Sequence, residues 1–191
     1  MPEETGISEL SSNIIVLTGP ESCGKTTLAS GLGEMLRAHV VPEISREYLN
    51  QRLGRDSHFH YSEPDLLEIA GEQHRLEQLA LGKNPELLLC DTDLLVLIIW
   101  SEVRFGTCHQ WILDSFAANI VTHKRHYLLC HYDVPWEADP LRENPDDREE
   151  LFALYQDKLD FYQLDYSIIC GNIEARLDQA MTVIEKKITR H

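Results

Sequence analysis

The sequence has little positive charge. Its 17 lysine and arginine residues stand against 32 aspartate and glutamate residues, which gives a net charge of −15. Non-specific binding of nucleic acid needs a surplus of cations that neutralise phosphates, so the charge argues against this class of protein. A small anionic ligand remains compatible with the composition, because a local group of backbone amides and a few cations can bind phosphate within an acidic chain.

Paired cysteines are also absent. The five cysteines are odd in number and form no Cys-x-x-Cys motif, which argues against a disulfide framework and against a zinc site. Cys90, Cys130 and Cys170 each end an apolar run, so we expect them to be buried like small hydrophobic residues. This usage favours a reduced protein of the cytoplasm.

The chain has no apolar run that could span a bilayer. The longest candidate, Leu87 to Trp100, contains Asp91 and Asp93 and is too short and too charged. Residues 1–12 are polar and acidic, so we expect a flexible tail and no signal peptide. Neither a membrane nor nucleic acid is expected as a partner.

Short apolar runs alternate with segments of helical periodicity after the tail. This alternation predicts one α/β domain over residues 13–191, with a five-stranded parallel sheet between two helical layers. The expected strands are Ile14–Thr18, Val40–Val41, Leu87–Cys90, His126–His131 and Tyr166–Cys170. The expected helices are Thr27–Ala38, Ser45–Leu53, Pro64–Leu81, Leu94–Phe105, Gln110–Thr122, Asp147–Leu164 and a last helix after Asn172. Residues 133–148 are rich in Pro, Asp, Glu and Arg and are expected to form a loop.

Residues 19–26 match the phosphate-binding pattern G-x-x-x-x-G-K-T at every defined position. An expected strand precedes them and an expected helix follows, so backbone amides and a helix N-terminus can close around a polyphosphate. Lys25 is placed to reach the β- and γ-phosphates, and the Thr26 hydroxyl to bind Mg²⁺. The predicted ATP-binding residues are Gly19, Glu21, Ser22, Cys23, Gly24, Lys25, Thr26 and Thr27.

Acidic residues follow two of the expected strands, where ligands of open α/β sheets bind. Asp91 comes directly after the third strand and is the expected Mg²⁺ residue, binding the ion directly or through water; the alternative is a helix cap. Asp93 could assist the metal, approach the phosphoryl acceptor, or only cap the next helix. Glu43 follows the second strand and could accept the proton of a substrate hydroxyl. Arg46 could hold the acceptor or the transferring phosphate, unless it only forms surface ion pairs with its acidic neighbours.

The loop over residues 133–148 carries further candidates. Arg142 and Arg148 could supply positive charge over ATP as a closing lid, with Arg142 the better placed. Trp136 could stack on a base or pack against the lid. The alternative is a solvated acidic loop in which the arginines pair with nearby carboxylates.

These motifs occur in the same order as in the NadR-type kinase domains, which are ribosylnicotinamide kinase modules with stand-alone ATPase and kinase relatives. The chain resembles them over nearly its whole length from residue 13 onward. The resemblance is carried by four strings: Gly19–Thr27, Val41–Tyr48, Cys90–Asp93 and Pro135–Arg142.

The resemblance implies a P-loop kinase fold with strand order 2-3-1-4-5 and an arginine-bearing lid. It implies transfer of the ATP γ-phosphate, with Mg²⁺, to a nucleoside-like hydroxyl such as that of nicotinamide riboside, a step of NAD biosynthesis. Asp91 or Glu43 would serve the metal and the acceptor proton, and the helix from Pro64, with Gln73 and His74, would wall the acceptor pocket. Where the family carries an aromatic residue suited to stacking on nicotinamide, this chain has Pro42, so the acceptor stays open.

A nucleotide-dependent regulatory ATPase without a small acceptor is the alternative class. A GTPase is disfavoured, because no D-x-x-G follows the third expected strand and no N-K-x-D follows the fourth.

Overall fold

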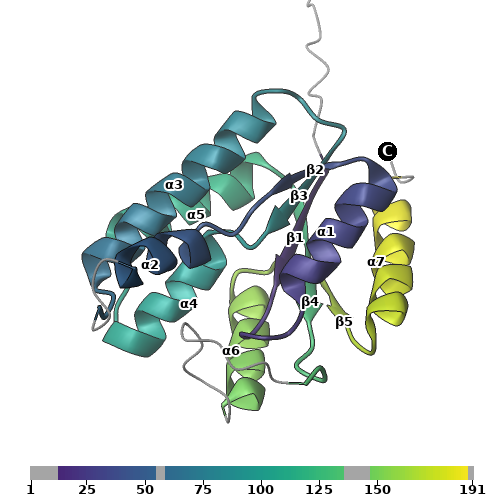
Figure 1. The fold of residues 1–191 in the computed structure, drawn as a ribbon. Helices are drawn as coiled ribbons and strands as arrows, with labels where there is room; N and C mark the ends of the chain where they lie inside the picture. The colour runs from purple at the N-terminus through teal and green to yellow at the C-terminus, as the bar shows by residue number, and fades with distance from the viewer. Residues whose placement is uncertain (1–12, 55–58, 136–146, 189–191) are drawn as a thin grey trace, which may run out of the picture.

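The five strands form one parallel sheet in the order β2-β3-β1-β4-β5, as the resemblance implied (Figure 1). The structure is a computed structural model that describes residues 13–54, 59–135 and 147–188. The strands are β1 Asn13–Thr18, β2 His39–Val41, β3 Leu87–Asp91, β4 Arg125–Cys130 and β5 Tyr166–Ile169. The expected tail at residues 1–12 lies outside the described residues.

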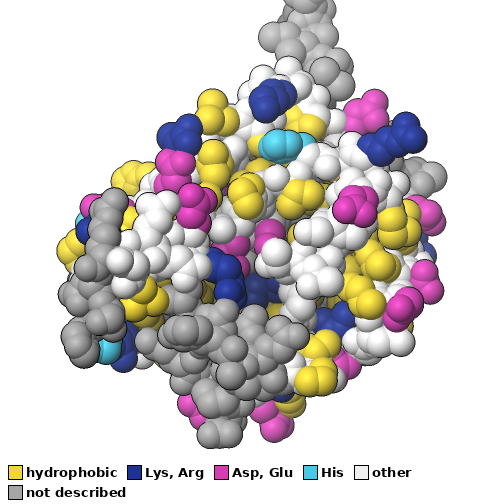
Figure 2. Space-filling model, viewed as in Figure 1, with side chains coloured by type: hydrophobic (Ala, Val, Ile, Leu, Met, Phe, Trp, Pro, Cys, Tyr) yellow, Lys and Arg dark blue, Asp and Glu magenta, His cyan; other side chains and the backbone are white. Residues whose placement is uncertain are grey.

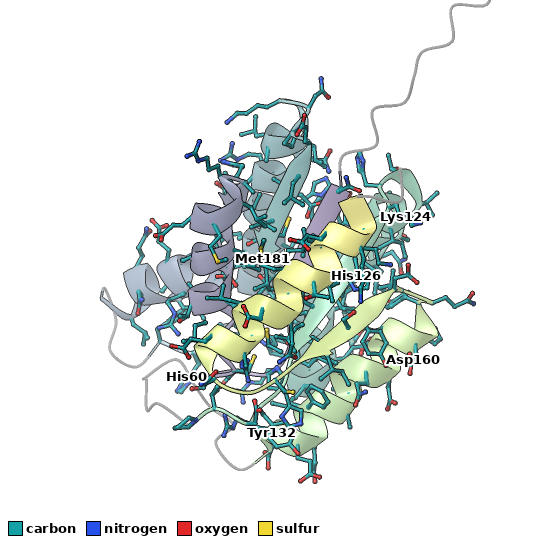
Figure 3. The ribbon with its side chains drawn as sticks, turned by 90° about the vertical axis from the view of Figure 1, so that its right-hand side faces the viewer. His60, Lys124, His126, Tyr132, Asp160 and Met181 are labelled. Carbon is teal, nitrogen blue, oxygen red and sulfur yellow. The ribbon has the colours of Figure 1, made fainter. Side chains whose placement is uncertain are left out.

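Helices cover both faces of the sheet (Figure 1). They are α1 Lys25–Leu36, α2 Ser45–Leu53, α3 Glu63–Leu81, α4 Leu94–Phe105, α5 Gln110–Thr122, α6 Arg148–Phe161 and α7 Ile173–Ile188. Helices α1 and α7 pack on one face, and Figure 3 looks onto α7, which carries Met181. Helices α3, α4, α5 and α6 contribute to the core on the other face. None of the helices among the described residues is long and apolar enough to cross a membrane.

The central strands are apolar on both faces because each face is covered by helices. In β1, Ile14 and Val16 belong to the core under α3 and α4, whereas Ile15 and Leu17 belong to the core under α1 and α7. All four side chains are at most 1% exposed. Burying each such side chain contributes about 1.5–3 kcal/mol, which is why a parallel sheet shows continuous apolar runs rather than alternation.

Some helices and strands begin or end at other residues than expected, because of helix caps and strand pairing. Helix α1 begins at Lys25, two residues before the expected start, because Gly24 is its N-cap, and it ends at Leu36 because Arg37 adopts a left-handed conformation. Strand β4 begins at Arg125, which pairs with Ile14 of β1. The expectation for Cys170 is wrong: it follows the end of β5 and is exposed, while Cys90 and Cys130 are buried within strands.

A buried ionic cluster joins β4 to the helices α3 and α4. The Arg125 guanidinium lies 2.8 Å from Glu77 Oε1 and 3.1 Å from Asp93 Oδ2, and these three side chains are at most 2% exposed. The Tyr127 hydroxyl also donates to Asp93 Oδ2, at 2.7 Å. The other carboxylate oxygen of Asp93 accepts from the backbone N–H of Leu95 and so caps α4. The cluster thereby fixes the start of α4 against β4.

Replacing Arg125 by methionine should destabilise the fold strongly. The substitution leaves Glu77 and Asp93 as buried carboxylates without their cation, so we expect urea unfolding to show a loss of about 3–5 kcal/mol. The matched control is Arg75→Met, which removes an exposed, solvent-screened pair with Glu72 on α3 and should leave the urea midpoint close to native. Equal losses in the two variants would contradict a structural role for the cluster.

Candidate active site

The loop between β1 and α1 has the backbone that a phosphate cradle requires. Gly19 has φ +133°, and a Cβ atom there would lie 2.7 Å from the carbonyl oxygen of Cys130. Gly24 has φ +80° and leads directly into α1 at Lys25. Only glycine fits these two positions, because any side chain would clash or strain the backbone. The strand, loop and helix expected around residues 19–26 are therefore present.

A buried arginine of α7 holds the outer side of this loop. The Arg176 guanidinium donates to the carbonyl oxygen of Cys23 at 2.7 Å, and the residue is 1% exposed. Its other partners lie at the ends of β4 and β5: the carbonyl oxygens of His131 (2.8 Å) and Gly171 (2.7 Å), and the Asp133 carboxylate. A trans peptide points its C=O and its N–H in opposite directions. Because Arg176 binds the carbonyl oxygen of Cys23, the N–H of Gly24 in the same peptide group points away from Arg176.

Arg148, at the start of α6, holds the same loop from another side. Its Nη1 atom donates to the carbonyl oxygen of Val134 at 3.0 Å and to that of Ser22 at 3.5 Å. The expected lid cation therefore binds loop carbonyls in this structure. Trp136 and Arg142, the other candidates from this segment, lie outside the described residues.

The Lys25 ammonium is folded against its own loop. It donates to the carbonyl oxygens of Gly19 (2.9 Å) and Pro20 (2.7 Å), and its Nζ lies 3.8 Å from Cys23 Sγ. Burial works against its charge, but the nearby groups Cys23, Tyr155, Glu43 and Asp91 outweigh burial and raise the pKa of Lys25 above its ordinary value. Lys25 is therefore a cation at neutral pH, as phosphate binding requires.

The Cys23 thiol is buried beside two cations. Burial would raise its pKa, but a hydrogen bond from Cys130 and the charges of Lys25 and Arg176 lower the pKa of Cys23 from 9.0 to about 6. The interior of the cradle thus favours negative charge even at a sulfur atom.

Asp91 ends β3 next to the loop and is 2% exposed. The Thr26 hydroxyl hydrogen-bonds to its carboxylate, whereas Oδ1 has no hydrogen-bond partner among the described residues. Burial raises the pKa of Asp91, and Glu43 adds to this shift, while Thr26 and Lys25 oppose it. A buried carboxylate oxygen without a donor, next to a hydroxyl, fits Mg²⁺, which binds few protein oxygens and completes its shell with phosphate and water.

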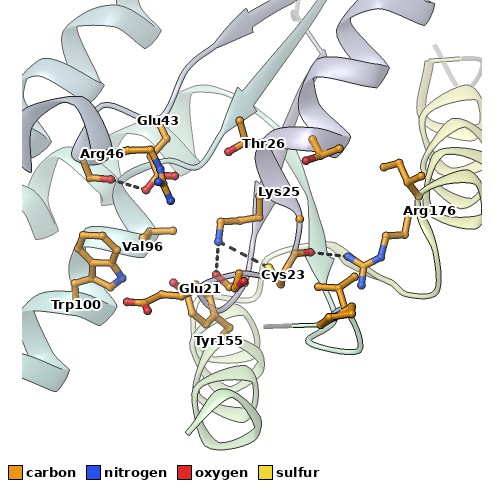
Figure 4. A pocket seen from close by; sticks show the side chains of 18 of the residues that line it. Glu21, Cys23, Lys25, Thr26, Glu43, Arg46, Val96, Trp100, Tyr155 and Arg176 are labelled. Carbon is orange, nitrogen blue, oxygen red and sulfur yellow. Dashed lines mark hydrogen bonds between the residues drawn. The ribbon is translucent and has the colours of Figure 1, made fainter. Parts of the chain in front are cut away.

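Glu43, Ser45 and Arg46 follow β2 and face the loop. Ser45 Oγ donates to Glu43 Oε1, and Figure 4 shows Glu43 and Arg46 on the opposite side of the cavity from Arg176, with Lys25 between them. The charge of Glu43 raises the pKa of Asp91 and that of Arg46 lowers it, so both side chains lie near the Asp91 carboxylate. The two residues predicted for the acceptor thus lie together with the triphosphate loop.

Residues of the phosphate loop, residues after β2 and Arg176 line one cavity of about 340 Å³, whereas Asp91 and Arg148 are not among its lining residues. Figure 2 shows lysine and arginine side chains around a hollow in the face that carries the loop. The cavity has three parts. The loop contributes Gly19, Glu21, Ser22, Cys23, Gly24, Lys25, Thr26 and Thr27; the side of α2 and α4 contributes Glu43, Ser45, Arg46, Leu49, Val96 and Trp100; the remainder is Val134, Pro135, Tyr155, Ile173 and Arg176.

Three residues expected near the acceptor lie elsewhere. Gln73 is buried, and both polar atoms of its side-chain amide bind the backbone. Its oxygen accepts from the N–H of Ile44 at 3.1 Å, and its nitrogen donates to the carbonyl oxygen of Pro42 at 3.2 Å. His74 packs on α5 rather than facing the cavity. Asp93 caps α4 and pairs with Arg125, so the capping alternative is the one that the structure contains. Gln73 supports the segment that carries Glu43 without lining the cavity.

The sequence did not single out Trp100, Tyr155 or Arg176, although all three line the cavity. Trp100 and Tyr155 lie in helices whose periodicity indicates ordinary core positions. The sequence contained one indication that Arg176 is buried, because it lies on the face of α7 that packs Leu177 and Ala180 against the core. A charged residue on a buried face needs partners, and these come from two distant segments, at Cys23 and at residues 131–133, and from Gly171 just before α7.

Comparison with known sequences decides the family. The family described as "AAA domain" matches residues 14–176, which is most of the chain. The chain belongs to this AAA domain family. The trifunctional NAD biosynthesis/regulator protein NadR of Escherichia coli (strain K12) is 25% identical over 158 residues, which are 80% of this chain and 37% of NadR. The chain thus spans about a third of that relative's length, and the NadR resemblance inferred from its motifs is confirmed.

Solved structures agree with the fold of this AAA domain protein. A deoxyadenosine kinase from M. mycoides, with dCMP and dCDP bound, superposes with a TM-score of 0.63 at 15% identity and covers 91% of this chain and 99% of its own. A NadR protein in complex with NR also gives a TM-score of 0.63, at 18% identity, covering 85% of this chain and 44% of its own. At these identities the likeness establishes the α/β P-loop fold.

Replacing Arg176 by lysine should weaken ATP binding. Lysine keeps the charge, but its single ammonium cannot reach the three carbonyl oxygens that Nε, Nη1 and Nη2 of Arg176 bind separately, so the loop amides lose part of their fixed orientation. We expect roughly tenfold lower affinity for a non-hydrolysable ATP analogue in calorimetry, the equivalent of one charge-assisted hydrogen bond. The exposed Arg75→Lys serves as the control and should leave affinity unchanged. Native affinity in Arg176→Lys would show that the loop needs no such support.

Replacing Asp91 by asparagine should stabilise the ligand-free protein at neutral pH. Because burial raises the folded-state pKa of Asp91, the folded state binds its proton more tightly, and the free energy of unfolding falls as pH rises through that pKa. The variant should therefore melt at a higher temperature at pH 7, with the difference disappearing towards pH 4. The control is the exposed Asp114→Asn on α5, which should melt close to the native temperature at pH 7. A lower melting temperature for Asp91→Asn at pH 7 would contradict this assignment.

Proposed function

We propose that this protein is an ATP- and Mg²⁺-dependent kinase that transfers the γ-phosphate to a hydroxyl of a nucleoside-like small molecule, with nicotinamide riboside as the first candidate. One observation carries the proposal: the phosphate loop after β1 and the Glu43 carboxylate after β2 line the same cavity, at the ends of the two strands that flank β3. A pure nucleotide-binding module has no need of a carboxylate opposite the phosphate loop. A regulatory ATPase would use one to activate water, so the dependence of ADP release on an acceptor distinguishes it from a kinase.

Each part of phosphoryl transfer has a residue suited to it. The amides of residues 19–26 and the Lys25 ammonium would bind the β- and γ-phosphates. Thr26 and Asp91 would hold Mg²⁺, which supplies charge neutralisation on the phosphate oxygens when bound. Glu43 would accept the proton of the acceptor hydroxyl, and its hydrogen bond from Ser45 keeps the carboxylate in place.

The cations around the cavity have complementary roles in this proposal. Arg46 would hold the acceptor or the transferring phosphate, since its charge lies near Asp91. Arg148 and Arg142 would supply charge from the segment that follows β4. Arg148 already contacts the carbonyl oxygen of Ser22, so a small shift of its side chain would bring it to the phosphates.

The relatives support this class of reaction. One is a curated NAD biosynthesis protein and another is a deoxyadenosine kinase with nucleotides bound. The structure of a NadR protein with NR makes nicotinamide riboside the natural first acceptor to test. All five cysteines are unpaired, which supports a reducing compartment such as the cytoplasm.

Acceptor-dependent ADP release tests the proposal. In native protein with ATP and Mg²⁺, nicotinamide riboside or another nucleoside should raise ADP release well above the rate without acceptor. Lys25→Ala should lower kcat by roughly 100-fold or more, because it removes charge stabilisation of the transferring phosphate. ADP release at one rate with and without every acceptor would instead indicate a regulatory ATPase.

Glu43→Gln separates acceptor activation from ATP binding. Because the amide cannot accept the hydroxyl proton, kcat should fall by roughly 100-fold while the KM for ATP stays within a factor of two. Glu47→Gln, four residues later and in the first turn of α2, is the matched control and should keep native kinetics. An equal loss of kcat and ATP affinity in Glu43→Gln would mean that Glu43 only shapes the cavity.

A further inference from the structure

Two cysteine thiols meet under the phosphate loop. Cys23 belongs to the loop, and Cys130 is the last residue of β4, the strand that pairs with β1. The two thiols are hydrogen-bonded to each other, and both residues are at most 1% exposed. They lie on the same side of Gly19, because a Cβ atom there would be 3.3 Å from Cys23 Sγ and 3.4 Å from the backbone nitrogen of Cys130. The fold thus joins two sulfurs that are distant along the chain.

The two thiols differ in reactivity. Cys23 lines the cavity, with Lys25 Nζ 3.8 Å from its sulfur, whereas Cys130 is not among the lining residues (Figure 4). Against the effect of burial, the hydrogen bond from Cys130 and the charges of Lys25 and Arg176 lower the pKa of Cys23. The same hydrogen bond, together with burial, raises the pKa of Cys130. A small oxidant in the cavity therefore meets the nucleophilic sulfur of Cys23 first, with a second thiol directly behind it.

Phosphoryl transfer leaves this pair without a role. The reaction uses backbone amides, Lys25 and a metal ion, and no step of it needs a thiol. The other buried cysteine, Cys90, faces the core on the opposite side of the sheet. The contact between Cys23 and Cys130 is thus a feature of the loop that the proposed function does not explain.

We propose that Cys23 and Cys130 form a modification site at which hydrogen peroxide produces a disulfide, and that this disulfide and bound ATP exclude each other. The inference goes beyond the proposed kinase function and needs only that ATP binds at the loop. In a reducing compartment such a disulfide is transient, as is usual for intracellular disulfides that report oxidation.

The oxidation takes two steps. The Cys23 thiolate attacks one oxygen of the peroxide and the O–O bond breaks. Cys23 becomes a sulfenic acid, and the departing hydroxide leaves as water with the proton that the thiol released. The Cys130 sulfur then attacks the Cys23 sulfur and the S–O bond breaks. This second hydroxide leaves as water with the Cys130 proton, so two thiols and one peroxide give one disulfide and two waters.

The geometry of the loop makes the disulfide and ATP compete. A covalent bond holds two sulfurs closer together than a hydrogen bond does, so Cys23 must move towards β4. The N–H of Gly24, which would serve the phosphates, belongs to the next peptide group and moves with it. Conversely, the phosphates of ATP would draw the Lys25 ammonium away from the Cys23 sulfur and would cover the side from which peroxide arrives. Each event therefore disfavours the other.

Treatment of the native protein with hydrogen peroxide tests the site. Intact mass should show the loss of two hydrogen atoms, and peptide mapping without reductant should find Cys23 joined to Cys130. In calorimetry the oxidised protein should bind a non-hydrolysable ATP analogue at least roughly tenfold more weakly, the equivalent of one charge-assisted hydrogen bond to phosphate. Dithiothreitol should restore the native affinity.

The same analogue should protect the site. At about 100 times its Kd the rate of cross-linking should fall by about 100-fold, because only the unbound protein reacts. An unchanged rate under these conditions would contradict the competition between the disulfide and ATP.

Two variants of Cys130 test the order of the steps. Cys130→Ala and Cys130→Val remove the second sulfur and leave the loop sequence intact, so both should bind the analogue as the native protein does before oxidation. After peroxide they should form no cross-link, and dimedone should trap a sulfenic acid on Cys23 far more abundantly than in the native protein. The matched control is Cys170→Ser, which removes an exposed cysteine and should cross-link as the native protein does.

Three further results would overturn the inference. The first is the absence of a Cys23–Cys130 peptide after oxidation, the second is equal affinity for the analogue in the reduced and oxidised proteins, and the third is a dimedone adduct on Cys130 in place of Cys23. Each of these leaves the proposed kinase intact. Failure of the reduced native protein to bind the analogue would instead refute the proposed function, together with the competition inferred from it.

Discussion

The hydrogen bonds of the Arg176 guanidinium hold the site together. One buried side chain joins the phosphate loop to the ends of β4 and β5 through the carbonyl oxygens of Cys23, His131 and Gly171. A buried cation is costly unless it is fully paired, so these segments stabilise Arg176 as much as it orders them. The loop amides thus keep their orientation before any phosphate arrives, and such preorganisation is what electrostatic catalysis requires.

The cavity carries several positive charges although the chain as a whole is negatively charged. The protein carries a net charge of −15, yet Lys25, Arg46 and Arg176 all line the cavity. Despite burial, a hydrogen bond from Cys130 and the charges of Lys25 and Arg176 lower the pKa of Cys23, and the negative groups around Lys25 raise the pKa of its ammonium. Such a site selects a polyphosphate by local field and geometry, while the acidic surface disfavours longer polyanions.

Local sequence patterns predicted the strands, the helices and the part of the site that lies at the strand ends. The phosphate loop, the strands and the positions of Glu43 and Asp91 follow from short-range signals, because residues after parallel strands meet at one edge of the sheet. The partners of Gln73 and Asp93 could not be predicted, since they are decided by Ile44, Pro42 and Arg125, which lie far away along the chain. Trp100 looked like a core residue because helical periodicity shows which face is buried and not whether that face borders a cavity.

Phosphorus-31 NMR of the complete reaction tests phosphoryl transfer most directly. The protein would be incubated with ATP, Mg²⁺ and nicotinamide riboside or deoxyadenosine, and the phosphorus resonances followed over time. Transfer between the loop at residues 19–26 and an acceptor at Glu43 predicts a new phosphomonoester signal that grows in step with ADP while inorganic phosphate stays constant. Inorganic phosphate that grows in step with ADP, with no phosphomonoester and no dependence on acceptor, would contradict it.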